Sequence, residues 1–371
     1  MNHTLTAIAL IGLSACSCVL GDSDETAQAE DAPGIVLGYI PGWNEIDYMD
    51  LPWEQMTHAA HAFVGANEDG SLAPQDGVPD PQLAMAAHEH GVKLILSIGG
   101  AASDVYLNPM AQSPDSLSRF IGEVIEAVRA NDYDGIDLDW EHPQTEQAQE
   151  GYARLLKGLR AALDDLSKQN GGRPYLLTTA VNGWRFGVPG EVFTENCDFV
   201  NVMTYDIIGP WSNYLGHHAR LTASQTDINN GSDLSIESAM LFWSQTKGVP
   251  AEKLLVGLPF YARGFRELTP YSVVEEKNSE LHTIYIYSEL AKKLEQGWTR
   301  QWNVENRAPW MTSPDGGESV GFDDPESIAG KVRWARDHGY GVMIWAIGQD
   351  RLSDGSYPLI QAVSDEMLWD K

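Results

Sequence analysis

Asp134-Gly135-Ile136-Asp137-Leu138-Asp139-Trp140-Glu141-His142-Pro143 is a stretch in which apolar side chains alternate with carboxyl groups. Side chains on a β-strand point alternately to its two faces. The apolar residues would therefore pack on one face, and the carboxyls would line the other at spacings of about 6–7 Å. Pro143 would end the strand, because proline cannot donate to a β-ladder. The pattern predicts a buried strand that carries a column of acids.

The column of acids is unfavourable for folding by itself. Burial and neighbouring carboxylates both disfavour ionisation, so at least one pKa in the column should be raised. A structural strand gains nothing from that, whereas a site that needs a protonated acid near neutral pH does. A solvated acidic edge strand is the alternative interpretation. The apolar flanks and the strict alternation favour the site.

Apolar runs of strand length alternate with helical patterns from Gly34 onward, which indicates βαβ units and a parallel sheet. The runs are rich in Val, Ile and Leu, as in strands that are covered on both faces. We predict a (β/α)₈ TIM barrel with its chemistry at the C-terminal strand ends. A doubly wound open sheet is the alternative, but no phosphate-binding glycine fingerprint supports it. The predicted strands are Ile35–Ile40, His58–Val64, Lys93–Ile98, Gly135–Trp140, Leu176–Val181, Phe199–Thr204, Leu254–Pro259 and Val342–Ala346.

Two amphipathic helices are predicted on either side of the acidic strand. The first begins after Ser113-Pro114, with serine as N-cap and proline at the first helical position. The second begins near Thr145 and ends at Gly171-Gly172. This order makes the acidic strand the fourth of the barrel.

The acidic stretch resembles the DxxDxDxE signature of glycoside hydrolase family 18, the chitinase family, with acids at Asp134, Asp137, Asp139 and Glu141. Two other strand ends are similar to further motifs of that family. Ser97-Ile98-Gly99-Gly100 resembles SxGG, and the segment from Met203 to Trp211 resembles MTYDxxGPW. Motifs in the family's order extend from Tyr39 to Trp345. The resemblance therefore covers nearly all of the chain after its N-terminal segment.

The resemblance implies a role for each catalytic residue. Glu141 would protonate the glycosidic oxygen, and Asp139 would orient the 2-acetamido group of the substrate, which attacks the anomeric carbon in place of an enzyme nucleophile. Asp137 would tune Asp139, and Tyr205 would hydrogen-bond the acetamide carbonyl. Asp134 is expected to be structural.

The remaining predicted site residues lie at or near strand ends and would bind the sugar. Aromatic rings suit sugars, whose CH faces are apolar and whose rims are polar. Many relatives have a Trp directly after SxGG, whereas this chain has Ala101, which puts stacking on the product side in doubt. The predicted substrate-binding residues are Tyr39, Ser97, Gly99, Gly100, Trp140, Met203, Asp206, Trp211, Tyr261, Arg263 and Trp345.

Composition narrows the choice of partners. The chain has 371 residues and a net charge of −29, which argues against nucleic acid or an anionic membrane surface as partner. A neutral polymer such as chitin, or its oligosaccharides, fits. The three cysteines give no disulfide framework, and no His or Cys spacing indicates a metal. We expect no cofactor and no metal, and the sequence does not indicate an oligomeric state.

The first 20 residues are predicted to be an export signal. Their apolar run, residues 7–13, is too short to span a bilayer. It continues into Leu13-Ser14-Ala15-Cys16, which resembles the bacterial lipobox with Cys16 as the lipidated residue, although no Lys or Arg precedes it. Lipid anchoring to a bacterial cell envelope is the expectation, and simple secretion and a misassigned start are the alternatives. Residues 21–33 would form an acidic tether.

Residues 34–368 would form the catalytic barrel, interrupted at 265–321 by a small α+β insertion between strands seven and eight. The expected function is retaining, substrate-assisted hydrolysis of β-1,4-linked N-acetylglucosamine polymers or oligomers. An endo-β-N-acetylglucosaminidase acting on glycans or peptidoglycan is one alternative. A chitinase-like lectin that binds without cutting is another, although the presence of Glu141 and both strand aspartates favours the enzyme.

Overall fold

The structure is a computed structural model that describes residues 34–44, 46–273 and 279–368. The predicted export signal, the tether and Cys16 lie outside these residues. Among the described helices, none is long and apolar enough to cross a membrane.

Eight parallel strands close into a barrel, which confirms the predicted fold class. They pair in the order in which they occur along the chain, and the last pairs with the first through Val36 and Val342. The closed order excludes the open doubly wound sheet. The barrel strands are β1 (Val36–Pro41), β2 (His58–Ala66), β4 (Lys93–Gly100), β5 (Gly135–Trp140), β6 (Leu176–Asn182), β7 (Phe199–Met203), β8 (Leu254–Pro259) and β14 (Gly341–Trp345).

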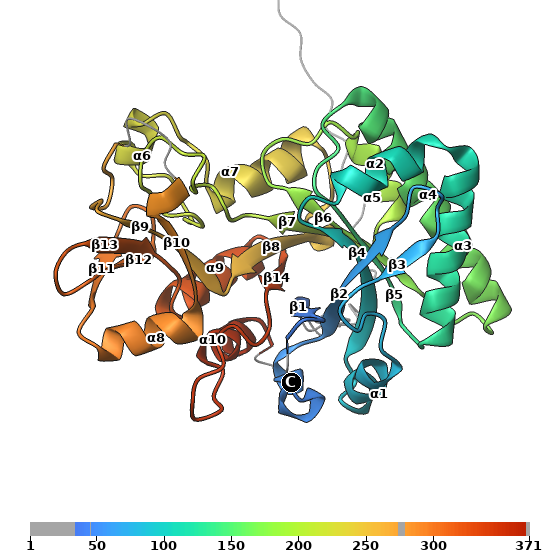
Figure 1. Ribbon diagram of the computed structural model, residues 1–371, viewed down its shortest axis with the longest axis horizontal. Coiled ribbons are helices and arrows are strands. Elements are labelled where there is room, and N and C mark those ends of the chain that lie inside the picture. The colour runs from blue at the N-terminus through green and yellow to red at the C-terminus, as the bar shows by residue number, and fades with distance from the viewer. Residues whose placement is uncertain (1–33, 45, 274–278, 369–371) are drawn as a thin grey trace, which may run out of the picture. The chain divides into compact units, whose positions relative to one another are not determined.

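Helices cover the outside of the barrel (Figure 1). Two caps follow the sequence prediction: the Ser113 side chain accepts from the N–H of Ser116, and the Thr145 side chain accepts from the N–H of Ala148. A short strand, β3 (Leu72–Pro74), pairs antiparallel with the end of β2. The helices outside the insertion are α1 (Pro81–Glu89), α2 (Asp104–Gln112), α3 (Pro114–Ala130), α4 (Glu146–Gln169), α5 (Gly190–Asn196), α6 (Gln225–Asn229), α7 (Ile236–Leu241), α9 (Pro325–Asp337) and α10 (Pro358–Met367).

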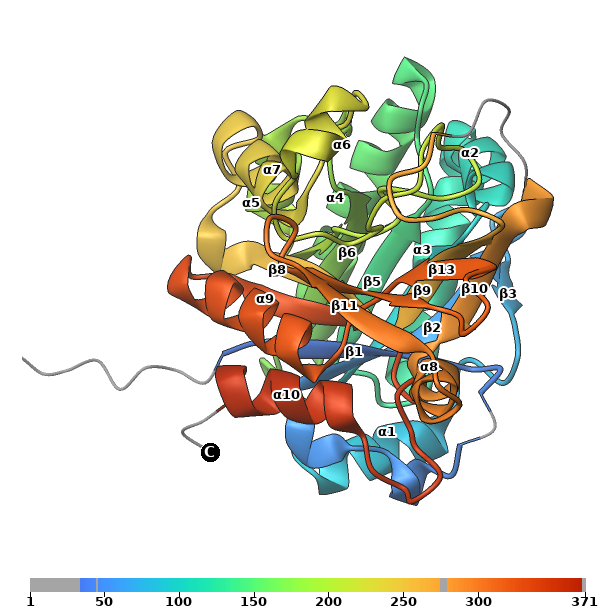
Figure 2. The same ribbon diagram turned by 90° about the vertical axis from the view of Figure 1, so that its left-hand side faces the viewer.

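Single helical turns complete the barrel layer. The 3₁₀ turns are Tyr48–Asp50, Trp53–Gln55, Ala251–Lys253 and Ser279–Leu281, and a π-helical turn, Phe242–Thr246, continues α7. Helices α9 and α10 lie side by side (Figure 2). The large apolar core lies between the strands and the outer helices, and a second apolar cluster that includes Leu37, Ile95 and Leu255 fills the barrel interior.

A five-stranded antiparallel sheet stands between β8 and β14, where the insertion was predicted. The sheet begins at Tyr261 rather than at residue 265, because β9 follows β8 after the single residue Phe260. In Figure 1 it lies on the opposite side of the barrel from α3 and α4. Its elements are β9 (Tyr261–Arg266), β10 (His282–Ile286), α8 (Tyr287–Glu295), β11 (Thr299–Asn303), β12 (Ala308–Thr312) and β13 (Glu318–Gly321).

Candidate active site

Strand β5 is fixed at its start by Asp134, which is buried. Its carboxylate accepts from Nη2 of Arg173 at 2.8 Å and from the N–H of Leu94 at 2.9 Å, and it lies 2.8 Å from Nε2 of His88. These partners come from the neighbouring strand and from two other segments of the chain. Asp134 therefore has the structural role expected for it.

The two faces of β5 differ as the alternation predicts. Ile136, Leu138 and Trp140 have no exposed surface and belong to the core beneath the helices. Asp137 faces the barrel interior, where its partners come from four other barrel strands. Asp139, two residues further on, lies on the same face of the strand and lines the cavity.

Asp137 is a fully buried carboxyl with four hydrogen-bond donors. Oδ2 accepts from the hydroxyls of Tyr39 at 2.9 Å and Ser97 at 2.7 Å. Oδ1 accepts from the hydroxyl of Thr178 at 2.6 Å and from Nδ2 of Asn201 at 3.1 Å. Burial raises the pKa of Asp137, and the four donors act in the opposite direction. Asp137 is thus held below the cavity floor and does not reach the cavity.

Asp139 lies above Asp137 and is only 4% exposed. Its Oδ1 is buried and has no hydrogen-bond partner in the part of the chain that the structure describes. Burial, then the charges of Glu141 and Asp137, raise the pKa of Asp139 well above its ordinary value. Its ionised form is therefore disfavoured until a ligand donates to it or brings a positive charge, and Oδ1 is free for such a ligand.

Gly99 allows β4 to approach β5 beside Asp139, with which it is paired in register. Its φ of 115° belongs to the region that favours glycine. A Cβ at this position would lie 2.1 Å from the backbone oxygen of Asp139. The glycine of the SxGG-like motif is thus required by the closeness of the two strands.

Glu141 follows the last residue of β5 and lines the cavity. Its backbone N–H donates to Oγ of Ser103 at 2.9 Å, which fixes the turn that follows the strand. Burial, together with the charge of Asp206, raises the pKa of Glu141 to about 7. Glu141 is therefore a proton donor near neutral pH.

Asp206 is the third carboxyl group that lines the cavity, and both of its oxygens accept hydrogen bonds. Arg263 donates to both of its oxygens, from Nε and Nη2 at 2.6 Å each, and the Tyr261 hydroxyl donates at 2.5 Å. Burial alone would raise its pKa, but the hydrogen bonds from Arg263 and the nearby ring of His218, 3.5 Å away, hold the pKa of Asp206 below its ordinary range. Asp206 is therefore an anion that Arg263 and Tyr261 hold in place.

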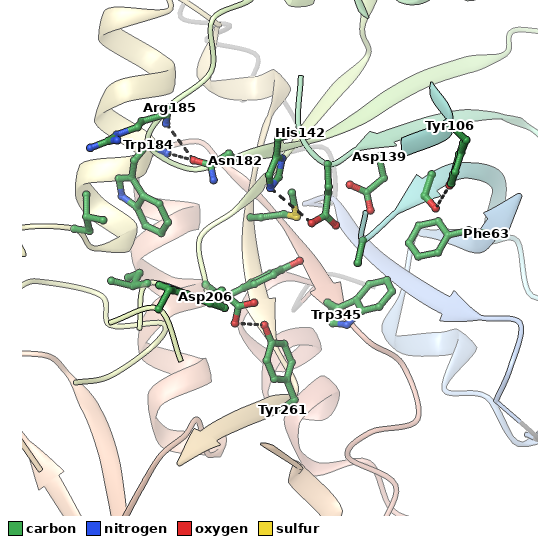
Figure 3. A pocket seen from close by; sticks show the side chains of 18 of the residues that line it. Phe63, Tyr106, Asp139, His142, Asn182, Trp184, Arg185, Asp206, Tyr261 and Trp345 are labelled. Atoms are coloured by element: carbon green, nitrogen blue, oxygen red, sulfur yellow. Dashed lines mark hydrogen bonds and ion pairs between the residues drawn. The ribbon is translucent and has the colours of Figure 1, made fainter. Parts of the chain in front are cut away.

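The cavity at the C-terminal ends of the strands has a volume of about 870 Å³ (Figure 3). Trp345 lies against Phe63, with ring centroids 5.6 Å apart and planes 18° apart. The Tyr205 hydroxyl points at Sδ of Met343, 3.9 Å away, and so keeps its capacity for a stronger partner. The predicted residues that line the cavity are Gly99, Asp139, Glu141, Met203, Tyr205, Asp206, Trp211, Tyr261 and Trp345.

The prediction that Trp140 binds substrate is wrong. Trp140 lies on the apolar face of β5, so alternation turns it away from the acids. Its ring packs against Tyr152 at 5.9 Å, and its Nε1 donates to Asp104 at 2.9 Å. Trp140 is part of the core between β5 and the helices.

Four other predicted substrate-binding residues act from behind the cavity surface. Tyr39 and Ser97 are buried and bond to Asp137 instead of reaching a ligand. Arg263 is 9% exposed and holds Asp206. A Cβ at Gly100 would lie 2.6 Å from the Phe63 ring, so this glycine makes room for that ring. None of the four lines the cavity.

The sequence prediction missed several residues that line the cavity from strands, helices and loops. Phe63 and Asn182 lie near strand C-termini, so the rule that sites occupy these ends could have found them. Oδ1 of Asn182 accepts from the N–H groups of Trp184 and Arg185, and this turn directs both side chains to the cavity rim (Figure 3). The lining residues outside the predicted site are Trp43, Phe63, Gln75, Ala101, Tyr106, His142, Asn182, Trp184, Arg185, Ile207 and Leu234.

Within the described ranges, no group of three His, Cys, Asp or Glu side chains could hold a metal ion.

A parallel barrel with a raised-pKa acid above a buried column of carboxyls, in an aromatic cavity, defines a glycoside hydrolase site. Residues 35–350 match the model of glycosyl hydrolases family 18, and the chain belongs to this family. An endochitinase of Brugia malayi is 27% identical over 372 residues, which cover 92% of this chain and 71% of that protein.

Solved structures agree with this assignment. A group IV chitinase of Ostrinia furnacalis, in complex with allosamidin, is 26% identical with a TM-score of 0.78. The match covers 90% of this chain and 98% of that chain. A chitinase-like agglutinin of Robinia pseudoacacia is 25% identical with a TM-score of 0.77, over 89% of this chain and 99% of that one.

Proposed function

We propose that the protein hydrolyses β-1,4-linked N-acetylglucosamine polymers or oligomers with retention of anomeric configuration, using the acetamido group of the substrate as nucleophile. One observation carries the proposal. Glu141 has a pKa of about 7, whereas the other cavity carboxylate outside β5, Asp206, is fully paired with Arg263 and Tyr261. A retaining mechanism with an enzyme nucleophile needs a free carboxylate about 5 Å from the acid, with the two carboxyls flanking the scissile bond. Asp139 comes from the same strand end as Glu141, so it does not face Glu141 across that bond. A nucleophile supplied by the substrate removes that need.

In the proposed reaction, Glu141 gives its proton to the glycosidic oxygen as that bond breaks. The acetamide carbonyl oxygen attacks the anomeric carbon and forms a cyclic oxazolinium ion. Asp139, whose Oδ1 is free, accepts from the acetamide N–H and stabilises the positive charge. The Tyr205 hydroxyl bonds the acetamide oxygen. Water then attacks the anomeric carbon from the face that the leaving group left and opens the oxazolinium ring. Glu141 takes up the proton of this water.

The aromatic cavity supports a sugar polymer as substrate. Trp345, Phe63 and Tyr261 present ring faces or edges that suit the apolar faces of pyranose rings. The names of the related proteins, endochitinase and chitinase, support chitin or its oligosaccharides in particular.

Glu141→Gln tests the proposal. The variant keeps the size and shape of the side chain, so it should fold and bind chitotetraose. It should lose at least about two orders of magnitude in kcat, the usual scale for loss of a general acid. Glu146→Gln, at the exposed first turn of α4, is the matched control and should stay active. For the wild type, kcat/KM should fall as pH rises past about 7, because Glu141 then loses its proton.

Product analysis completes the test. NMR during hydrolysis should show the β-anomer first, as retention requires. Cleavage of a high-mannose glycopeptide with no cleavage of chitotetraose would favour the endo-β-N-acetylglucosaminidase alternative. Binding of chitotetraose without any cleavage by the wild type would favour a lectin, such as the agglutinin to which this chain is similar.

We further propose that the protein is exported and anchored to a bacterial envelope through a lipid on Cys16. The apolar run and the lipobox-like sequence before Cys16 support this. In a bacterial host fed a labelled fatty acid, the wild type should carry the label and sediment with membranes. Cys16→Ser should lose both properties, and Cys18→Ser, two residues away, should keep them. A labelled Cys16→Ser protein would contradict the proposal.

A further inference from the structure

His142 directly follows the proton donor and lines the same cavity (Figure 3). Its Nε2 lies 3.6 Å from Oε2 of Glu141, and the two side chains are 31% and 26% exposed. The other ring nitrogen, Nδ1, is buried and meets no hydrogen-bond partner among the residues that the structure describes. The two nitrogens of this imidazole therefore lie in different surroundings.

This difference selects the tautomer of the neutral ring, which carries one proton. A proton on Nδ1 would be a buried donor without a partner, which is rarer and less favourable than an unpaired acceptor. The proton therefore belongs on Nε2, the nitrogen that faces Glu141. At 3.6 Å this contact is longer than a hydrogen bond, but such contacts at active sites often tighten when substrate binds.

The surroundings of His142 place its pKa below that of Glu141. Two acids bear on it: Glu141 from the end of β5, and Asp104 from the start of α2. Burial lowers the pKa of His142 below its ordinary value, and the charge of Asp104 only partly offsets this. As pH rises, His142 therefore loses its proton before Glu141 does. Between the two pKa values, the imidazole is neutral while Glu141 still carries its proton.

We infer that His142 is a positioning residue that donates its Nε2–H to Glu141 as Glu141 becomes a carboxylate. The inference rests on the proposed function. When Glu141 passes its proton to the glycosidic oxygen, its new negative charge is met by a fixed donor, and His142 keeps its own proton throughout. Hydrogen bonds to an ionised acceptor are about twice as strong as neutral ones. The contact therefore favours the transition state over the ground state, as catalysis requires.

Two variants of similar polarity separate this role from a structural one. In His142→Gln the amide nitrogen can occupy the place of Nε2, whereas in His142→Asn the side chain is one methylene shorter and cannot reach Glu141. We expect His142→Asn to lose about tenfold in kcat, and its kcat/KM profile to keep activity to about one pH unit higher. The shift is upward because the carboxylate of Glu141 loses a donor, so its pKa rises. His142→Gln should restore both values to near wild type.

The measurement is the pH dependence of kcat and KM on chitotetraose, with thermal unfolding of each variant as a check on folding. A structural role would lower stability and leave the basic limb in place, so an unchanged limb in His142→Asn would overturn the inference. His142→Phe, which keeps the ring volume without a donor, replaces Asn if that variant does not fold. An inactive wild type would count against the proposed function instead, which keeps the two failures distinct.

Discussion

Asp137 joins four strands through one side chain. Its donors are Tyr39 on β1, Ser97 on β4, Thr178 on β6 and Asn201 on β7. Because these strands surround β5 inside the barrel, the carboxyl both holds the barrel interior together and supports Asp139 above it. At the scale of single residues, stability and the catalytic column thus depend on the same group.

We therefore predict a graded loss of stability at this position. Asp137→Ala leaves several buried polar groups unpaired and creates a void, so the free energy of unfolding should fall by about 3 kcal/mol or more. Asp137→Asn should lose about half as much, because the hydroxyls of Tyr39 and Ser97 can turn to accept from its amide. Urea unfolding of the three proteins measures the series. Equal stability of the Ala and Asn variants would contradict the role of the four donors.

The same residue scale shows where sequence alone suffices. Alternation along β5 is a local property, so the side of the strand on which Asp137, Asp139 and Trp140 fall could be predicted. The prediction that Trp140 binds substrate was based on its place at a strand end and contradicted that alternation. The structure follows the alternation.

At the scale of elements, the strands and the flanking helices were predictable because their signals are local. Serine and threonine caps fix the starts of α3 and α4, and apolar runs mark each barrel strand. The ends of strands were less predictable. Strand β2 continues to Ala66 because β3 pairs with its last residues. The sequence of β2 alone does not predict this pairing.

The lining of the cavity depends on loops, and for this reason sequence reasoning found only part of it. Trp184 and Arg185 reach the rim through a turn made by Asn182, and Trp184 is then held by Ser238 of α7, 3.1 Å away. The contact joins residues 54 positions apart. Periodicity within a single element carries no information about such a pairing. The acids on β5 could be placed without knowledge of any distant pairing.

At the scale of the whole catalytic unit, a buried polar cluster around Asp227 connects the insertion to the barrel. Its carboxylate accepts from Nη1 of Arg220 at 2.8 Å and from the Tyr214 hydroxyl at 3.0 Å, and both members of the ion pair have no exposed surface. Nδ2 of Asn306, in the turn between β11 and β12, donates to the same carboxylate at 2.6 Å. The polar cluster therefore joins the β7–β8 connection to the insertion.

The polar cluster also contacts the segment that lines part of the active-site cavity. The β7–β8 connection carries Trp211 and Leu234, which line the cavity. The carbonyl of Leu234 accepts from Nε of Arg220 at 2.6 Å. Breaking the hydrogen bonds of the polar cluster should therefore weaken substrate binding as well as the attachment of the insertion.

Asp227→Asn tests this coupling, because it leaves the buried Arg220 charge without its counter-ion. Breaking a buried pair in this way lowers the free energy of unfolding by about 3–5 kcal/mol. The matched control is Glu126→Gln, which breaks the exposed pair with Arg129 on α3 and should change stability by no more than about 1 kcal/mol. Urea unfolding measures both variants, and KM for chitotetraose should rise in Asp227→Asn alone. Equal stability of the two variants would show that the polar cluster does not hold the insertion in place. An unchanged KM in a destabilised Asp227→Asn would show that the cluster stabilises the fold without shaping the cavity.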